Sequence, residues 1–157
     1  MNPKIAIFDR GDKLLAILSP DNPATTPFYN DVMTERHSTG YIKHEFDCLA
    51  DKEVMQYIVA ENQVVVPDSE GNFIPFVIKQ VETRQGREGL TATIQSEIAS
   101  MELLSNNLRP IRPAVMTVSS VLATLLNGTR WRPGNIETTK EITFSVDNYM
   151  TVIEYLN

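Results

Sequence analysis

Residues 41–48 read Tyr-Ile-Lys-His-Glu-Phe-Asp-Cys, in which every second side chain is phenolic or charged. Because successive side chains of a strand point to opposite faces of a sheet, this alternation predicts an antiparallel strand with one buried face. We expect four side chains on the buried face: Ile42, His44, Phe46 and Cys48.

Strand and turn patterns continue on both sides of this stretch. Apolar or alternating runs occupy residues 5–8, 13–18, 28–36, 54–59, 63–66, 73–84 and 90–98. The clearest hairpin turns fall at 9–12, where Gly11 is available for a positive φ, and at 67–72. Three prolines within 19–27 predict a loop. Up to about residue 108, the pattern therefore indicates only strands and turns.

The pattern changes after that point. Residues 109–113 contain two prolines and two arginines, and we interpret them as a stiff connector. Thr117 is a suitable N-cap for an amphipathic helix over 118–127, and Gly128 is suited to end it.

A strand is expected at 141–146, followed by the start of a second helix over 149–157. Asp147 or Asn148 is a suitable cap for this second helix. Because no ending signal for the helix precedes Asn157, we expect the chain to be the N-terminal piece of a longer polypeptide.

These patterns indicate a mainly β fold with an α+β portion. The first domain is expected over residues 1–108 and a partial second domain over 109–157. A chain of 157 residues, of which 42% are hydrophobic, can bury a core without disulfides or metals. Its one cysteine cannot form an internal disulfide, which fits a reducing place of synthesis.

The charge balance argues against nucleic-acid partners. The chain carries 14 basic and 20 acidic side chains, net −6, without a basic cluster, so we expect no stable nucleic-acid binding. The longest apolar runs, such as 14–18, are far shorter than the roughly 20 residues of a membrane-spanning helix, so no membrane span is expected. Residues 1–8 lack the pattern of a secretory signal, which predicts synthesis in a cytoplasm.

His44 and Cys48 share a predicted strand face, and His37 lies just upstream, which raises a metal or thiol-nucleophile hypothesis. Residues four apart on a strand lie about 13 Å apart, too far for both to bind one ion. A Cys-His pair would require His37 to return from the adjacent strand. We therefore interpret Cys48 as a small core side chain and His44 as a residue at the edge of the core.

Carboxylate clusters give no stronger signal. Residues 68–72 begin like a calcium loop, but residue 79, at the position of the bidentate Glu, is Lys, and strands rather than helices flank the segment. Two carboxylate pairs are interpreted as solvated charge: Asp9 with Asp12, and Glu45 with Asp47. No phosphate loop, nucleophile elbow or zinc-protease motif is present. We assign no catalytic, metal-binding or cofactor-binding residue and expect no cofactor.

Trp131 is the one tryptophan, and it follows the predicted helix in a polar, turn-rich context. Two interpretations remain open. In the first, the Trp131 ring folds back on the helix and anchors the core. In the second, the ring faces a partner protein, as aromatic side chains in interfaces often do.

A longer series of segments resembles a known family. It comprises the hairpin Glu61-Asn62-Gln63-Val64-Val65-Val66-Pro67-Asp68 and its continuation to Glu82, then residues 90–97, Leu103-Leu104 and 121–131. Their order and spacing, clearest over 41–134, resemble the N-terminal region of phage minor structural proteins. This family is often called prophage tail endopeptidase or tail-associated lysin.

The resemblance implies a tail hub similar to the baseplate hub of contractile-tailed phages. Residues 1–108 would form an antiparallel β-barrel hub domain, and a mixed α/β domain would begin after it. Three copies would form a ring that closes the distal end of the tail tube in the virion. The implied partners are the other two copies, a distal tail protein, the tube ring and a tape-measure protein. Any peptidoglycan-degrading activity is expected in a C-terminal extension, so these residues are not expected to be an enzyme.

Two other classes of function remain as alternatives. One is a peptidoglycan hydrolase fragment whose site, centred on Cys48 or elsewhere, is completed by further residues, and fragment release from purified peptidoglycan would favour it. The other is a cell-surface glycan-binding module, which needs an exposed aromatic cluster. The candidate aromatic residues are dispersed in the sequence: Tyr29, Tyr41, Tyr57 and Trp131.

Overall fold

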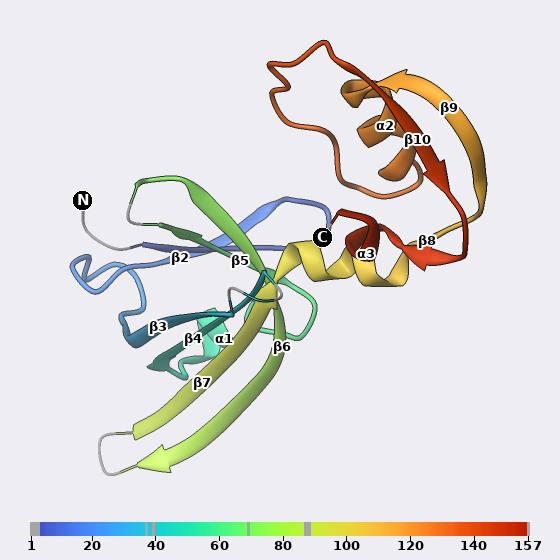
Figure 1. The fold of residues 1–157 in the computed structure, drawn as a ribbon. Coiled ribbons are helices and arrows are strands. Elements are labelled where there is room, and N and C mark those ends of the chain that lie inside the picture. Colours follow the sequence, from blue (N-terminus) through green and yellow to red (C-terminus); the bar gives the residue numbers. More distant parts are fainter. Residues whose placement is uncertain (1–3, 37, 39, 69, 87–88, 157) are drawn as a thin grey trace. The chain divides into compact units, whose positions relative to one another are not determined.

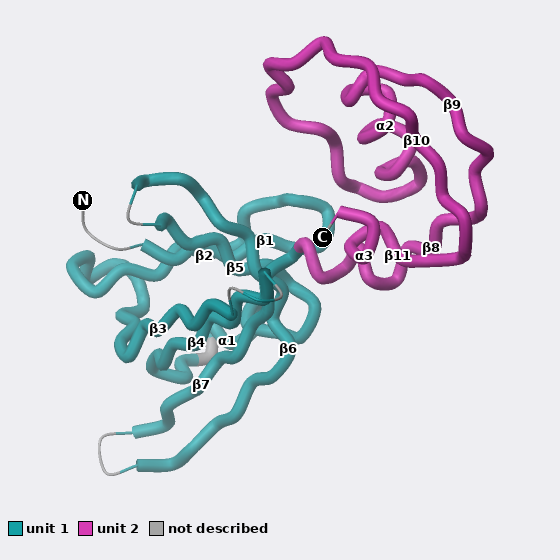
Figure 2. The backbone as a smooth tube through the Cα atoms, viewed as in Figure 1, with its two compact units in different colours: residues 1–99 teal, residues 100–157 magenta. Residues whose placement is uncertain are grey.

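The computed structural model describes residues 4–36, 38, 40–68, 70–86 and 89–156. The chain divides into two compact units, unit 1 over residues 1–99 and unit 2 over residues 100–157 (Figure 2). The boundary expected after residue 108 lies inside unit 2.

Unit 1 is built on one antiparallel sheet of seven strands (Figure 1). The strands are β1 (Ile5–Phe8), β2 (Leu14–Leu18), β3 (Phe28–Arg36), β4 (Tyr41–Leu49), β5 (Gln63–Pro67), β6 (Phe73–Gly86) and β7 (Gly89–Ile98). Their order across the sheet is β2-β1-β5-β6-β7-β4-β3. The expectation of a mainly β fold is confirmed.

The expectation of a closed β-barrel is wrong. Within the described residues, β2 and β3 are the two edges of the sheet, and no strand pairing joins them. Residues 19–27 connect these edges and contain Pro20, Pro23 and Pro27. Because proline has no amide hydrogen to donate to a ladder, this segment cannot extend either edge into a closing strand.

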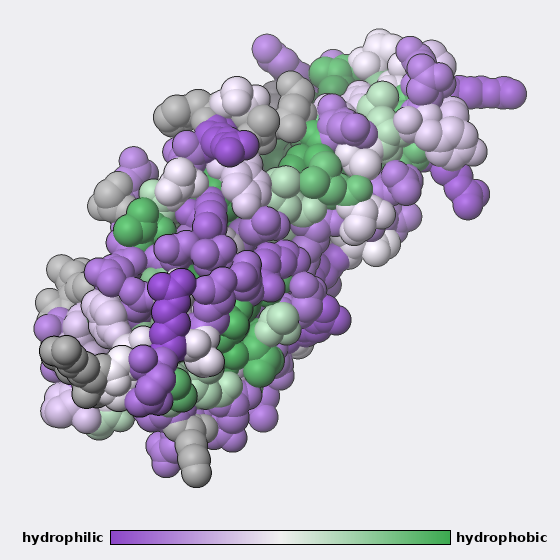
Figure 3. All heavy atoms as spheres, turned by 90° about the horizontal axis from the view of Figure 1, so that it is seen from below, coloured by the Kyte–Doolittle hydropathy of each residue, from purple (hydrophilic) through white to green (hydrophobic). Residues whose placement is uncertain are grey.

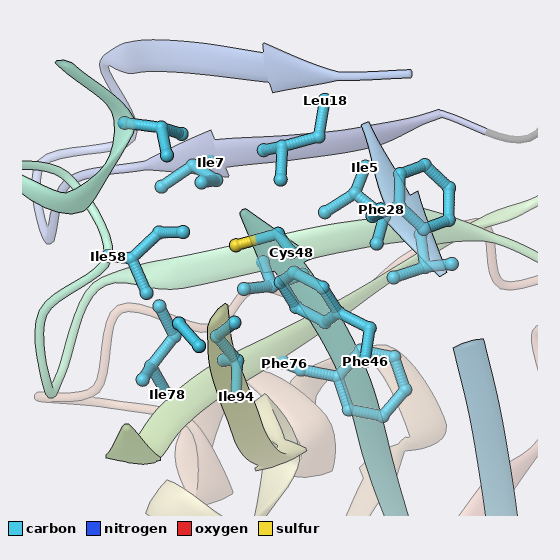
Figure 4. Close-up of a cluster of buried hydrophobic side chains, with 14 residues drawn as sticks. Ile5, Ile7, Leu18, Phe28, Phe46, Cys48, Ile58, Phe76, Ile78 and Ile94 are labelled. Carbon is cyan, nitrogen blue, oxygen red and sulfur yellow. The ribbon is translucent and has the colours of Figure 1, made fainter. Parts of the chain in front are cut away.

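The sheet curls around one core. Fourteen buried side chains from all seven strands and the segment 54–58 form a single cluster, and Figure 4 shows Phe46, Cys48, Phe76 and Ile94 among its members. The alternation in residues 41–48 is confirmed, since His44, Phe46 and Cys48 are fully buried and Ile42 is partly buried against them.

A bulge lets the long strand β6 keep this core face. Ile78 pairs with Ser96 and Gln80 pairs with Gln95, so Lys79 is an extra residue on β6. An extra residue reverses which side chains face inward. Consequently Ile78 before the bulge and Val81 after it both pack against the core.

The strand expected at 54–59 is wrong, because a short helix, α1 (Lys52–Met55), begins there. Asp51 caps it, accepting hydrogen bonds from the backbone N–H of Glu53 at 2.8 Å and of Val54 at 3.0 Å. These hydrogen bonds, first of all that from Val54, lower the pKa of Asp51. The capped turn therefore overrides the strand preference of the apolar run.

At the first hairpin the positive φ belongs to Asp12, at 62°, rather than to Gly11. The Asp9 carboxylate organises this turn by accepting from the backbone N–H of Gly11 and of Lys13, at 2.8 and 2.9 Å. Aspartate tolerates the left-handed conformation better than most residues, so glycine is not required there.

Unit 2 contains short strands and helices around a second core. They are a 3₁₀ helix, η1 (Ala99–Ser105), which begins at the last residue of unit 1, then β8 (Asn107–Leu108), β9 (Ile111–Thr117), α2 (Val118–Leu125), β10 (Glu141–Val146), β11 (Met150–Thr151) and α3 (Val152–Leu156). β9 pairs with β10, and β8 pairs with β11. The second core comprises Leu103, Leu108, Val121, Leu125, Phe144, Val146 and Val152.

Two expectations in unit 2 are corrected. The connector at 109–113 runs into strand β9, where Pro113 is tolerated because it falls at an irregularity in the pairing with β10. The last helix begins after Thr151 rather than after Asp147 or Asn148. Its Glu154 accepts from the backbone N–H of Thr151 at 2.7 Å, which completes a capping box.

The N-cap expected at Thr117 is confirmed. Its hydroxyl oxygen accepts from the backbone N–H of Ser120 at 3.2 Å, and α2 follows directly. Gly128 has a φ of 79° in the turn after the helix. No helix in the described part of the chain is long and apolar enough to cross a membrane.

Candidate functional site

The core of unit 1 contains a polar cluster around His44. His44 Nε2 lies 2.6 Å from Asp31 Oδ1, and Nδ1 lies 3.4 Å from Ser96 Oγ. The imidazole packs between the rings of Phe46 and Phe76, with ring centroids 5.5 and 5.1 Å away. The side chain of His44 is fully buried, whereas that of Asp31 is 31% exposed.

The order Ser96–His44–Asp31 has the connectivity of a catalytic triad, but its hydrogen bonds suit a structural role. The Ser96 hydroxyl is buried and donates its proton to the backbone oxygen of His44 at 3.1 Å. A nucleophilic serine must instead give this proton to the imidazole and face a substrate. The cluster therefore satisfies the polar atoms of a buried histidine.

Asp31 reaches His44 because of a bulge that the sequence analysis missed. Tyr29 pairs with Asp47 and Val32 pairs with Glu45, so β3 has one residue more than β4 in this interval. Asn30 has a φ of 53° there, and its Nδ2 donates to Asp47 Oδ2 at 2.7 Å. The signal in the sequence is Asn-Asp inside a strand, two residue types that strands disfavour.

Cys48 is a core side chain, as the sequence predicted. It is fully buried, and burial, followed by the charges of Asp51 and Asp47, raises the pKa of its thiol to about 12. Since the thiolate is the nucleophilic form, Cys48 is poorly suited to covalent catalysis. His37, the other member of the hypothesised pair, lies outside the described residues.

The carboxylates of Asp68, in the calcium-like loop, and of Asp12, in the first hairpin turn, already accept hydrogen bonds from nearby protein groups. Asp68 Oδ1 accepts from the backbone N–H groups of Glu70 and Asn72, both at 2.8 Å. The Asn72 side chain is the largest contributor to the lowered pKa of Asp68. Asp12 Oδ1 accepts from Gln63 Nε2 at 2.9 Å. Within the described ranges, no group of three or more His, Cys, Asp or Glu side chains is arranged to hold a metal ion.

Trp131 packs against the second core, which confirms the core-anchor interpretation. The Arg130 guanidinium lies 5.9 Å from the centroid of the Trp131 ring, and Arg130 Nε is 2.8 Å from Glu102 Oε2. Trp131 Nε1 is buried without a hydrogen-bond partner among the described residues. The tryptophan therefore contributes mainly through its apolar surface.

The face of β4, β7 and β6 opposite the core, here called the outward face, is polar and acidic. Its charged side chains are Lys43, Glu45, Asp47, Lys79, Glu82, Arg84 and Glu97, assigned by strand alternation and register. Lys43 contacts Glu45 at 3.1 Å, Arg84 contacts Glu82 at 3.2 Å, and the Thr93 hydroxyl donates to Asp47 at 2.6 Å. Four carboxylates thus outnumber three cations on this face, and Lys79 also contacts Glu61 at 3.1 Å.

The two edges of the sheet differ in chemistry. β3 carries Asp31, Glu35 and Arg36 and contains the bulge, which are features that discourage pairing with another strand. β2 reads Leu-Leu-Ala-Ile-Leu and has no charged side chain. On the face drawn in Figure 3, hydrophobic residues form separate patches among hydrophilic ones.

Comparison with known proteins identifies a similar fold. No family model and no curated protein sequence matches the chain. A solved structure described as the tail protein from Neisseria meningitidis MC58 is similar, with a TM-score of 0.51 and 11% sequence identity. The alignment covers 97% of this chain and 43% of that protein, so this chain spans less than half of its structural neighbour. At this identity the similarity concerns the fold alone.

Removing the Asp31 carboxylate alone should destabilise unit 1 more than removing both the carboxylate and the His44 imidazole. Asp31→Ala leaves the His44 imidazole with a buried polar atom unsatisfied, so we expect a loss of about 1–3 kcal/mol in the free energy of unfolding, measured with urea. Adding His44→Phe should recover part of this loss. Asp21→Ala, in an exposed loop, is the control. A double variant less stable than Asp31→Ala alone would contradict this role of the cluster.

The Cys48 thiol should be inert in the folded protein. With a pKa of about 12 it stays protonated at pH 8, so we expect iodoacetamide to modify it only after denaturation. Above pH 9 the unfolded chain loses the thiol proton while the folded protein keeps it, so folding stability should fall with rising pH. Cys48→Ala should lessen that fall. Rapid modification of the native protein, followed by mass spectrometry, would contradict this expectation.

Proposed function

We propose that this chain is a structural component of a bacteriophage or prophage tail, within the hub ring that closes the distal end of the tail tube. The observation that carries the proposal is the fold similarity to a tail protein over 97% of the chain. The order and spacing of segments in residues 41–134, which resemble phage minor structural proteins, agree with the same role. The proposed location is the virion, at the tail tip or baseplate.

The proposed assembly is a homotrimer, joined to a distal tail protein and the tube ring. A tape-measure protein is a further proposed partner. In a ring, one surface of each copy meets a different surface of the next copy. A sheet that ends in two unlike edges offers two such surfaces. The arrangements around His44 and Cys48 support a structural role rather than a hydrolytic one in these residues.

The outward face is the surface that we assign to the DNA passage of the ring. Unit 1 holds 9 of the 14 basic and 15 of the 20 acidic side chains, so the whole net charge of −6 lies in it, and unit 2 holds five of each. A wall of like charge repels phosphates, so DNA would pass without binding.

Native mass spectrometry of the purified chain tests the assembly. We expect a species with three times the mass of the monomer, together with three copies per tail in particles. A monomer at all concentrations that also releases fragments from purified peptidoglycan would replace the structural proposal with the hydrolase alternative.

A charge reversal on the outward face tests the DNA passage. We expect Glu45→Lys combined with Glu82→Lys to slow DNA ejection from particles, because phosphates would now be attracted to the wall. Glu70→Lys, on an exposed turn, is the matched control and should leave the rate unchanged. An unchanged ejection rate in the double variant would show that this face does not line the passage.

A further inference from the structure

The free edge of β2 lacks the charged side chains that β3 carries. β2 pairs with β1 on one side only within the described residues, and its five side chains are aliphatic. A bulge at Leu15, opposite the step from Ile7 to Phe8, turns Leu14 and Ile17 to the same face of the sheet. These two side chains are 48% and 43% exposed. An exposed apolar edge without charged side chains is a template for a further strand.

A groove of about 420 Å³ runs beside this edge. Its walls come from β2, from the loop before β3 and from α1 with the turn after it. The apolar lining includes Leu14, Ile17, Ala24, Val54 and Tyr57. Side chains of an added strand would therefore meet apolar surface next to the backbone groups of β2.

The charges around the groove are acidic. Glu53 lines it and is the one charged side chain among the described lining residues. Asp51 caps α1 next to Glu53, and the Thr26 hydroxyl, in the groove wall, donates to Asp51 at 2.9 Å. Backbone hydrogen bonding lowers the pKa of Asp51, so it is ionised at neutral pH. Lys13, directly before β2, is a cation that offsets part of this charge.

We propose that the β2 edge binds an extended segment of another protein, which adds an eighth strand to the sheet. The segment would present alternating apolar side chains to the groove and Lys or Arg side chains to Glu53 and Asp51. Backbone pairing would supply affinity, and the apolar and basic side chains would supply specificity. The proposal stands on the edge and the groove and does not require the tail role.

Two synthetic peptides test the proposal. In the first, valine and threonine alternate between terminal lysines, and in the second the terminal residues are glutamates. We expect the basic peptide to slow amide hydrogen exchange in β2 but not in β3. We also expect it to bind about tenfold more tightly than the acidic one at low salt, the effect of two partly exposed ion pairs. Glu53→Gln should reduce this ratio.

A variant with a charge on the β2 edge should lose binding without losing the fold. Ile17→Lys replaces an exposed side chain, so the protein should stay folded by circular dichroism yet lose peptide binding. Unchanged β2 exchange at saturating basic peptide, or equal binding of both peptides, would overturn the proposal. Protection of β2 by self-association without peptide would assign the edge to a second copy. Native mass spectrometry of the same samples tests the proposed trimer separately. The tail-assembly proposal and the β2-edge proposal can therefore fail independently.

Discussion

Phe46 and Phe76 lie in the middle of unit 1, where side chains from all seven strands meet in one buried cluster. Burying one face of a single sheet requires the sheet to curl, and the bulge at Lys79 keeps the long strand β6 facing inward as it does so. The loop 19–27 separates the two edges. The sheet therefore curls to bury the common core. It stays open because the proline-rich loop between β2 and β3 cannot form a closing strand.

His44 shows how this core accommodates a polar side chain. A buried imidazole is costly unless both ring nitrogens have partners, and Asp31 and Ser96 occupy those positions. The bulge at Asn30 brings Asp31 inward and at the same time disrupts the β3 edge. One irregularity therefore satisfies the core and discourages pairing at that edge, whereas β2, which also contains a bulge, carries no charged side chain.

The functional proposals depend on surfaces rather than on a reactive centre. The fold is similar to that of a tail protein, and the proposed DNA passage rests on the concentration of negative charge in unit 1. The aliphatic β2 edge and its acidic groove suit a protein partner. Assembly of this kind uses backbone pairing and apolar contact, for which the described residues offer an open edge.

The sequence by itself determined the local elements. Alternation predicted β4 with Cys48 in the core, whereas His44, expected at the edge of the core, is fully buried. A hydroxyl before an amphipathic run predicted α2 capped by Thr117. Tertiary structure decided the open sheet and the meeting of Asp31, His44 and Ser96, whereas the Asp51 cap of α1 is a local signal that the sequence reasoning missed. Side-chain periodicity is a property of neighbours in the chain, so it can be read locally. Sheet closure and the partners of a buried polar atom depend on segments far apart in sequence, whose pairing no local pattern encodes.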